Sequence, residues 1–473
     1  MSEIIRIDQL VDGQRFGRFN LSLLLWSFLA MFADGYDITA LSYAAPVLQK
    51  LWHVPKENFG VVMSAHLFGI LFGAPLFGLW GDRRGRRSAI VAGSVIYGVA
   101  SLGVVWTHSV SQIELLRFVT GLGLGGIMPN TIALNSELAP RRLRATLVTL
   151  MFVGITVGSS MPGLVVAPNL LPRYGWTVLF FVGGLVPLAV ALGLALRLPE
   201  SVKYLALRPH RRRELLRISR RMRPDLRLSE DAQFLPDSGA ESPGAAATAL
   251  SQIFKGSLGR ITPLLWLCFA TALMSNFFLN SFLPLIFSGH IDARHAAIAA
   301  GLYSVGGTVG GVLMSALLDR FGVVVIAALF AVSVPAIAAL GWVQPSFGPL
   351  AVLTALAGLG VLGAQFGNNA AAGLLYPTGV RAKGVGWALG IGRFGAILGP
   401  LLGARLLGLP ARELFLAAAA PMLVGAVAAC VLLVLCYRRL GGLHLSDIPA
   451  QEGEPPTTPV GSISGLSARE GGS

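Results

Sequence analysis

Apolar residues along the chain gather in blocks of about 20 residues, separated by short polar stretches. A block of that length crosses the hydrocarbon core of a bilayer, about 30 Å thick, as an α-helix. The strands of a membrane barrel would instead be about 10 residues long, with alternating polarity. We therefore predict an all-α membrane protein. Its twelve transmembrane helices are expected at residues 20–45, 59–81, 88–107, 111–136, 145–168, 175–197, 261–288, 296–318, 323–343, 348–373, 382–408 and 413–437.

The longest polar stretch divides the predicted helices six from six, which indicates two bundles. Hydrophobic residues make up 54% of the chain and charged residues 13%, which excludes a disordered chain, a coiled coil and an ordinary soluble enzyme. The first half of the polar stretch, RPHRRRELLRISRRMRPDLR, predicts a basic surface helix. The predicted parts are an N-terminal segment (1–19), a first bundle (20–197), a central loop (198–260), a second bundle (261–437) and a flexible tail (438–473).

Positive charge is unevenly distributed along the chain, whose 37 Lys and Arg and 23 Asp and Glu give a formal net charge of +14. In a soluble protein this excess would suggest nucleic acid as a partner. Here 29 of the cations fall on the side of the spans that both termini share, and 5 fall on the opposite side. Because cations collect on the cytoplasmic side of a membrane protein, we predict cytoplasmic termini, membrane lipid as a partner and no nucleic acid.

The two predicted bundles carry matching sequences at a fixed offset of 237 residues. The stretch GDRRGRR at 81–87 matches LDRFG at 318–322, and GLGLGG at 121–126 matches GLGVLG at 358–363. Pro140 and Arg144 match Pro377 and Arg381 at the same offset. Parallel repeats of this kind are typical of transporters rather than of channels or enzymes.

The motifs of this repeat resemble those of a known family. GLWGDRRGRR at 78–87, RFVTGLGLGG at 117–126 and LPES at 198–201 are similar to signatures of the major facilitator superfamily. Within it, DGYD at 34–37 and YPTGVRAKGVGWALGIGRFGAILGP at 376–400 resemble the aromatic acid:proton symporter family. The resemblance implies two six-helix repeat bundles in the cell (inner) membrane. It also implies proton-coupled uptake of a benzoate-like or hydroxybenzoate-like acid, with the substrate and protons as partners and a functional monomer.

Two carboxylates, Asp34 and Asp37, lie in the first predicted helix. Ionised groups at membrane depth are costly and are functional by default. The i, i+3 spacing places both on one face of the helix, where their repulsion favours a carboxyl that can take up a proton. We predict that both couple transport to protons, with Arg117 of the fourth helix at a similar depth to Asp37. The alternative is that an Asp37–Arg117 pair is only structural.

Arg393, near the middle of the eleventh predicted helix, is the candidate for binding the substrate. A guanidinium holds a carboxylate bidentately and stacks on an aromatic ring, although an internal ion pair would use it equally well. Neutral polar and aromatic groups at membrane depth need partners, and substrate or neighbouring helices would serve. The further candidate substrate-binding residues are Gln365, Asn369, Asn276, Asn280, Tyr36 and Asn130.

The charged turn after the second predicted helix is a candidate gate at the cytoplasmic face. Its charges would pair with neighbouring helix ends in one state and separate in the other, and the repeated copy in the second bundle favours this over a purely topogenic role. The candidate gate residues are Asp82, Arg83, Gly85, Arg86, Arg87, Glu137, Arg144, Asp319, Arg320 and Arg381.

The sequence contains no P-loop, metal-ligand cluster or nucleophile–base pair, so we expect no enzymatic activity, no cofactor and no bound metal. Energy for transport would then come from an ion gradient. The alternatives that remain are a carrier of another small organic acid, a sugar or a drug, and a membrane chemoreceptor for aromatic acids. A cationic drug would clash with Arg393, and the central loop has no recognisable signalling domain.

Overall fold

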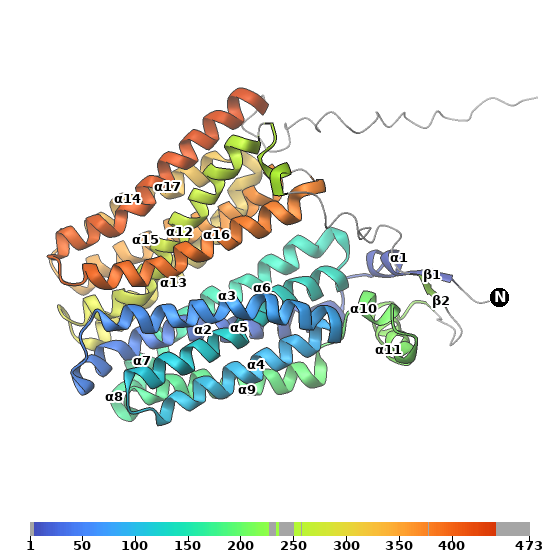
Figure 1. Cartoon of the computed structure of the whole chain (residues 1–473), viewed down its shortest axis with the longest axis horizontal. Coiled ribbons are helices and arrows are strands. Elements are labelled where there is room, and N and C mark those ends of the chain that lie inside the picture. Colours follow the sequence, from blue (N-terminus) through green and yellow to red (C-terminus); the bar gives the residue numbers. More distant parts are fainter. Residues whose placement is uncertain (1–3, 227–232, 236–249, 257, 377, 441–473) are drawn as a thin grey trace, which may run out of the picture.

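The computed structural model describes residues 4–226, 233–235, 250–256, 258–376 and 378–440, which form two helical bundles (Figure 1). The first bundle contains α2 (Arg18–Trp52), α3 (Asn58–Arg84), α4 (Arg86–Gly103), α5 (Val110–Leu138), α6 (Arg141–Met161) and α9 (Thr177–Arg197). The second bundle contains α12 (Leu258–Phe287), α13 (Ala293–Phe321), α14 (Val324–Ala339), α15 (Phe347–Leu375), α16 (Thr378–Leu406) and α17 (Ala411–Leu440).

These twelve helices lie where the apolar blocks predict them, and most extend beyond the apolar block into polar flanks. Ten helices of the described part are long and apolar enough to cross a membrane. The other two are α14, which has 16 residues, and α5, whose polar residues include Arg117 and Asn130. Short segments complete the connections: η1 (Val104–Trp106), η2 (Pro162–Val166), α7 (Ala167–Asn169), α8 (Leu171–Tyr174), η3 (Pro209–Arg211) and η5 (Leu250–Phe254).

Each bundle has a seam of glycines where two helices touch backbone to backbone. A Cβ added at Gly121 of α5 would lie 2.0 Å from the carbonyl oxygen of His66 on α3. At the repeated positions, a Cβ at Gly358 of α15 would lie 1.9 Å from the carbonyl oxygen of Tyr303 on α13. Small residues allow such close packing of membrane helices. Residues that lie 237 positions apart in the sequence therefore occupy equivalent positions in the two bundles.

The bundles meet near the end that carries the α2–α3 connection, which we call the opposite end. There the Ser64 hydroxyl donates to the Ile397 carbonyl at 3.1 Å, and Gly60 packs against Pro400 and Ala404. The other end, which carries α1, α11 and the α3–α4 turn, is called the basic end, and the bundles diverge towards it (Figure 1).

A cleft of about 540 Å³ separates the bundles between α6, α13 and α15. Its lining includes Thr146, Thr149 and Thr156 from the first bundle and Thr308 and Phe366 from the second. The two bundles therefore contact each other at the opposite end and are separated by this cleft towards the basic end.

The predicted basic helix is present as α11 (Arg212–Met222), which follows α10 (Val202–Ala206). Its apolar side chains, among them Leu215 and Met222, are buried in one cluster with Ile7 and Val11 of α1 (Ile7–Asp12). Strand β1 (Ile4–Arg6) pairs in parallel with β2 (Gln233–Leu235) from the central loop. The apolar face of α11 thus packs on protein, and the described parts of the N-terminal segment and of the central loop contact each other through α1–α11 packing and the β1–β2 pair.

Candidate functional site

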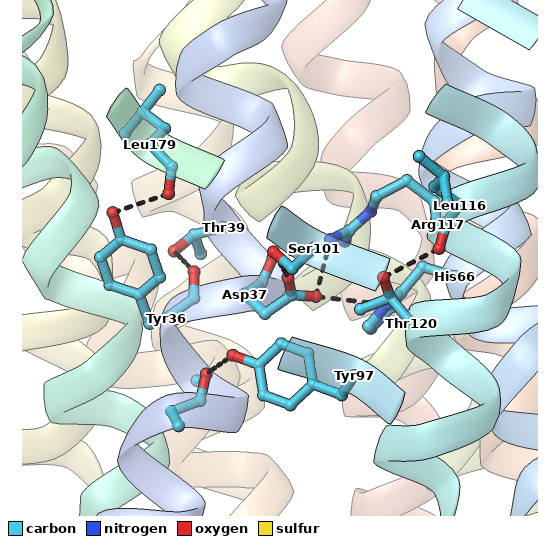
Figure 2. Close-up of polar contacts among 12 residues, drawn as sticks. Tyr36, Asp37, Thr39, His66, Tyr97, Ser101, Leu116, Arg117, Thr120 and Leu179 are labelled. Atoms are coloured by element: carbon cyan, nitrogen blue, oxygen red, sulfur yellow. Dashed lines mark hydrogen bonds and ion pairs between the residues drawn. The ribbon is translucent and has the colours of Figure 1, made fainter. Parts of the chain in front are cut away.

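A buried ion pair lies inside the first bundle, between α2 and α5 (Figure 2). Arg117 Nη1 donates to Asp37 Oδ2 at 2.6 Å, and Arg117 Nη2 donates to the Asp37 backbone oxygen at 3.3 Å. Asp37 has no exposed surface and Arg117 has 2%. Two charges in such a place are stable only when they neutralise each other and make further hydrogen bonds. The sequence predicts Asp37 and Arg117 at a similar depth in the membrane, and the structure shows them in contact.

Two side chains that the sequence did not single out complete the surroundings of Asp37. The Ser101 hydroxyl of α4 lies 3.5 Å from Asp37 Oδ1, and His66 Nδ1 of α3 lies 3.5 Å from Asp37 Oδ2 (Figure 2). Tyr97 of α4 lies beside them, with its hydroxyl donating to the Ala33 carbonyl at 2.7 Å. A histidine in an apolar helix is itself an intramembrane ionisable group, and that signal alone would have identified His66.

The residues between the two aspartates fix α2 against its neighbours. A Cβ at Gly35 would lie 1.9 Å from the Ile155 carbonyl oxygen, so only glycine lets α6 approach this closely. The Tyr36 hydroxyl donates to the Leu179 carbonyl of α9 at 3.1 Å. Tyr36 therefore points into the first bundle and away from the second, with its polar group already satisfied.

Asp34 has a different environment from Asp37. It is buried, with 6% of its surface exposed, and within the described residues its carboxylate accepts no hydrogen bond. Its opposite charge is Arg393 of α16, and the two attract each other between the bundles. Arg393 also reaches the first bundle directly, since its Nη1 donates to the Ile70 carbonyl of α3 at 3.5 Å. Asp34 and Arg393 thus are opposite charges on the two sides of the bundle interface, and within the described residues no direct ion pair joins them.

The polar candidates of the second bundle lie on α12 and α15. Asn276 Oδ1 accepts from Asn280 Nδ2 at 2.8 Å and from the Tyr303 hydroxyl at 3.1 Å, so these groups bond one another. Gln365 Oε1 is buried without a hydrogen-bond partner in the described part of the chain, and Asn369 is exposed. Buried polar atoms without partners are rare in proteins and are often satisfied by water or ligand.

The charged turn between α3 and α4 is held by side chains of the first bundle. Gly85 has φ +103°, a conformation that L side chains rarely adopt. Arg86 pairs with Asp82 at 2.7 Å and lies 3.7 Å from Glu137. Arg86 Nη1 also donates to Asn130 Oδ1 at 3.3 Å.

Asn130 belongs to this turn rather than to the bundle interface. Its Nδ2 donates to the Phe77 carbonyl at 3.1 Å and to the Gly126 carbonyl at 2.7 Å. All of its hydrogen-bonding capacity on the amide nitrogen is therefore used within the first bundle, next to Gly81, where a Cβ would lie 2.0 Å from Asn130 Oδ1.

Glu200, in the LPES motif after α9, binds the backbone of the charged turn. Its Oε1 accepts from the backbone N–H of Arg87 at 3.2 Å and from that of Ser201 at 3.0 Å. Burial raises the pKa of the Glu200 carboxyl, and these hydrogen bonds oppose that rise. The Ser201 hydroxyl donates to Glu137, and the Arg87 guanidinium donates to the Ala195 carbonyl.

The remaining gate candidates differ in how far the structure describes them. Arg83 is exposed, and its carbonyl accepts from Arg208. Arg144 is half-buried, and Arg381 Nε donates to the Tyr376 carbonyl at 3.1 Å. The side chains of Asp319 and Arg320 lie outside the described part of the structure. Among the described residues, no three His, Cys, Asp or Glu side chains come close enough together to hold a metal ion.

Comparison with known proteins gives consistent matches. The model of the Major Facilitator Superfamily matches residues 27–258 and 265–464. The 4-hydroxybenzoate transporter PcaK of Pseudomonas aeruginosa is 37% identical over 412 residues, which cover 86% of this chain and 90% of that protein. The gallate transporter of Pseudomonas putida is 33% identical (86% and 89% covered), and the benzoate transport protein of Acinetobacter baylyi is 32% identical (90% and 92% covered).

Solved structures share the fold. The inward open conformation of the xylose transporter XylE from Escherichia coli matches with a TM-score of 0.67 at 17% identity, covering 91% of this chain and 99% of that one. A bacterial homolog of the human lysosomal transporter Spinster, in an inward-facing conformation, matches with a TM-score of 0.64 at 17% identity, covering 92% and 99%.

Proposed function

The chain belongs to the major facilitator superfamily, and from this premise we propose that it takes up an aromatic carboxylate together with protons by alternating access. It is a multi-pass membrane transporter and not an enzyme. Relatives at 32–37% identity are named for 4-hydroxybenzoate, gallate and benzoate, and these acids share a ring and a carboxylate. The observation that carries the proposal is the placement of two opposite charges, Asp34 and Arg393, on the two sides of the bundle interface, with Arg393 reaching the Ile70 carbonyl of the first bundle.

That pair gives a physical route to coupling. A substrate carboxylate and the Asp34 carboxylate compete for the same guanidinium, so an ionised Asp34 opposes substrate binding. Protonation of Asp34 removes the competing charge and frees Arg393 to bind the acid in its planar fork. Proton and acid then bind together. In this proposal Asp34, Asp37 and Arg117 are the coupling residues, and Arg393 is the substrate-binding cation.

The neutral polar groups of the second bundle surround the same interface. Gln365, with its unpartnered oxygen, and Asn369 are proposed to contact the substrate directly, as are Asn276 and Asn280 once their mutual bond opens. Tyr36 and Asn130 bond within the first bundle in this state, and we propose a supporting role for them rather than contact with the substrate.

We further propose that the basic end faces the cytoplasm, so that the described state is open inward. The excess of 29 cations over 5 on that side supports this orientation in the inner membrane, with both termini cytoplasmic. The exposed side chains of Arg213, Arg217 and Arg221 on α11 then face the membrane surface and attract anionic lipid headgroups. Nothing in this arrangement requires a second copy of the chain, and we propose a functional monomer.

The charged turn serves as the gate in this proposal. In the first bundle, Arg86 pairs with both Asp82 and Glu137 while the cleft is open. When the cleft closes, they are expected to meet the repeated motif of the second bundle. The residues assigned to the gate are Asp82, Arg83, Gly85, Arg86, Arg87, Glu137, Arg144, Asp319, Arg320 and Arg381.

The proposal is tested with purified protein in liposomes. Labelled 4-hydroxybenzoate should accumulate when the outside is acidic and only equilibrate when no proton gradient exists. Unlabelled benzoate, gallate and nicotinate are added as competitors to rank ring acids, with xylose as the neutral control. Competition by xylose but by none of the acids would reject the proposed substrate class, and accumulation that ignores the proton gradient would reject proton coupling.

A further inference from the structure

His66 is a buried histidine whose ring makes no hydrogen bond in the described part of the structure. Its residue surface is 2% exposed, and both Nδ1 and Nε2 lack partners. Burying polar nitrogens without partners costs free energy that an apolar side chain of similar size would not cost. A group of this kind in a membrane helix therefore needs a reason other than packing.

The backbone around His66 is held firmly in place. The carbonyl of His66 packs against Gly121 of α5, where a Cβ would lie 2.0 Å from it, so at this point α3 and the helix that carries Arg117 are in backbone contact. At the repeated position in the second bundle stands Tyr303, whose hydroxyl donates to Asn276 of α12. That tyrosine links the second helix of its bundle to the first. In the first bundle the same place points His66 at the first helix, α2, and at its Asp37.

The carboxylate of Asp37 is approached by polar groups from three helices. Arg117 of α5 occupies Oδ2 at 2.6 Å, while Ser101 of α4 lies near Oδ1. His66 Nδ1 of α3 lies 3.5 Å from the same Oδ2. This distance exceeds that of a good hydrogen bond by only about 0.5 Å. Among the described residues, His66 is thus the donor poised to reach Oδ2 when Arg117 is not there.

We propose that His66 is the second partner of Asp37: the guanidinium of Arg117 holds the carboxylate in the state seen here, and the imidazole holds it when Arg117 turns away. His66 is then a positioning residue that acts through Asp37, not a ligand of the substrate. In the state seen here the His66 ring has no hydrogen-bond partner among the described residues. In the proposal this is because the imidazole is already in place to bind Asp37 in the other state. The inference rests on the proposed proton-coupled transport, but it can be tested without a substrate.

The first test uses thermal unfolding of the purified full-length protein, with an isosteric pair of variants. His66→Leu removes every hydrogen bond, and His66→Asn keeps a donor close to the position of Nδ1. In the parent protein, where the ring bonds nothing, His66→Leu should leave Tm unchanged or raise it. In the Arg117→Met background the imidazole should be holding Asp37, so His66→Leu should lower Tm by about 2–4 °C. His66→Asn should recover at least half of that loss.

The second test compares two transport readouts in liposomes at matched protein amounts. In the proposal Arg117 turns away from an ionised Asp37 while the empty carrier changes orientation, and His66 holds the carboxylate during that step. Exchange of loaded carrier need not pass through it. His66→Leu should therefore reduce gradient-driven uptake at least 10-fold and change equilibrium exchange less than 2-fold, with His66→Asn intermediate. In the Asp37→Asn background, adding His66→Leu should change neither readout, because the partner is gone.

Each outcome decides the question. The same sign of the Tm change in both backgrounds would overturn the second-partner role, and so would equal loss of uptake and exchange in His66→Leu. Identical behaviour of the Leu and Asn variants would mean that only the shape of the side chain matters. The Tm cycle involves no substrate, so it stands even if the parent protein carries no aromatic acid. If Arg117→Met does not fold, the split between uptake and exchange decides alone.

Discussion

Asp34 and Asp37 are one helical turn apart, yet their truncation should affect stability very differently. Asp37 is fully buried and bound twice by Arg117, whereas Asp34 accepts no hydrogen bond among the described residues. Asp34→Ala and Asp37→Ala delete the same atoms, so the two variants share the effect of the lost volume. What differs is that Asp37→Ala strips a fully buried guanidinium of its direct ion pair. By contrast, Asp34→Ala leaves Arg393, which is only partly buried, makes no direct ion pair with Asp34 and still donates to the Ile70 carbonyl.

The size of the difference follows from that geometry. Removing one partner of a buried ion pair costs about 3–5 kcal/mol. For a folding unit of about 150–250 residues, each kcal/mol shifts Tm by about 2–4 °C. The Tm of Asp37→Ala should then lie about 6–20 °C below that of Asp34→Ala. Adding Arg117→Met to Asp37→Ala should recover much of the loss, because it removes the stranded charge.

Thermal unfolding of the detergent-purified variants, followed by tryptophan fluorescence, measures this difference. The parent protein and the Arg117→Met single variant complete the cycle. Equal Tm values for Asp34→Ala and Asp37→Ala would refute the reasoning, since the ion pair would then contribute nothing that Asp34 lacks. A double variant less stable than Asp37→Ala would refute the idea that the stranded guanidinium causes the loss.

Further predictions concern coupling, substrate binding, the gate and pH. Asp34→Asn should abolish gradient-driven accumulation of 4-hydroxybenzoate while exchange persists; equal loss of both would remove Asp34 from coupling. Arg393→Lys keeps the charge but not the planar fork, so the KM for the acid should rise about 10-fold with maximal rate less affected, and an unchanged KM would exclude the carboxylate-binding role. Asp82→Asn should nearly abolish uptake at normal membrane abundance, and normal rates would leave the turn a topogenic role only. Because burial raises the pKa of Glu200, its contribution to stability is present at low pH and is lost as pH rises through that raised pKa. The Tm of Glu200→Gln should therefore rise relative to the Tm of the parent as the pH goes from 4 to 7. A Tm difference between the two proteins that does not change with pH would contradict this.

Periodic features of the chain were readable from the sequence. Apolar block length located the twelve helices, and the 237-residue offset identified the repeat, because both depend only on position along the chain. Depth along a helix was also readable, and it brought Asp37 and Arg117 to the same level. Equal depth made their pairing possible, and the structure shows the contact at 2.6 Å.

The direction in which a side chain points was harder to predict. Spacing i, i+3 leaves two side chains about 60° apart around the helix axis, enough for Asp37 to face the first bundle and Asp34 the second. Tyr36 and Asn130 lie at plausible depths but point to α9 and to the α3–α4 turn. His66 carries a readable signal as an ionisable residue in an apolar helix, but nothing in the sequence predicts that its ring points at Asp37. Such orientations are set by packing between helices, which no local spacing encodes.

The buried ion pair of Asp37 and Arg117 affects how transport responds to the membrane potential. A membrane potential does work only on net charge that moves through it, about 2.3 kcal/mol per elementary charge per 100 mV. The pair carries no net charge and lies within one bundle, so rocking of that bundle displaces no charge on its account. A monovalent acid that crosses with one proton is equally neutral. Uptake by such a carrier would draw on the pH gradient alone, and any dependence on voltage would report protons beyond the first.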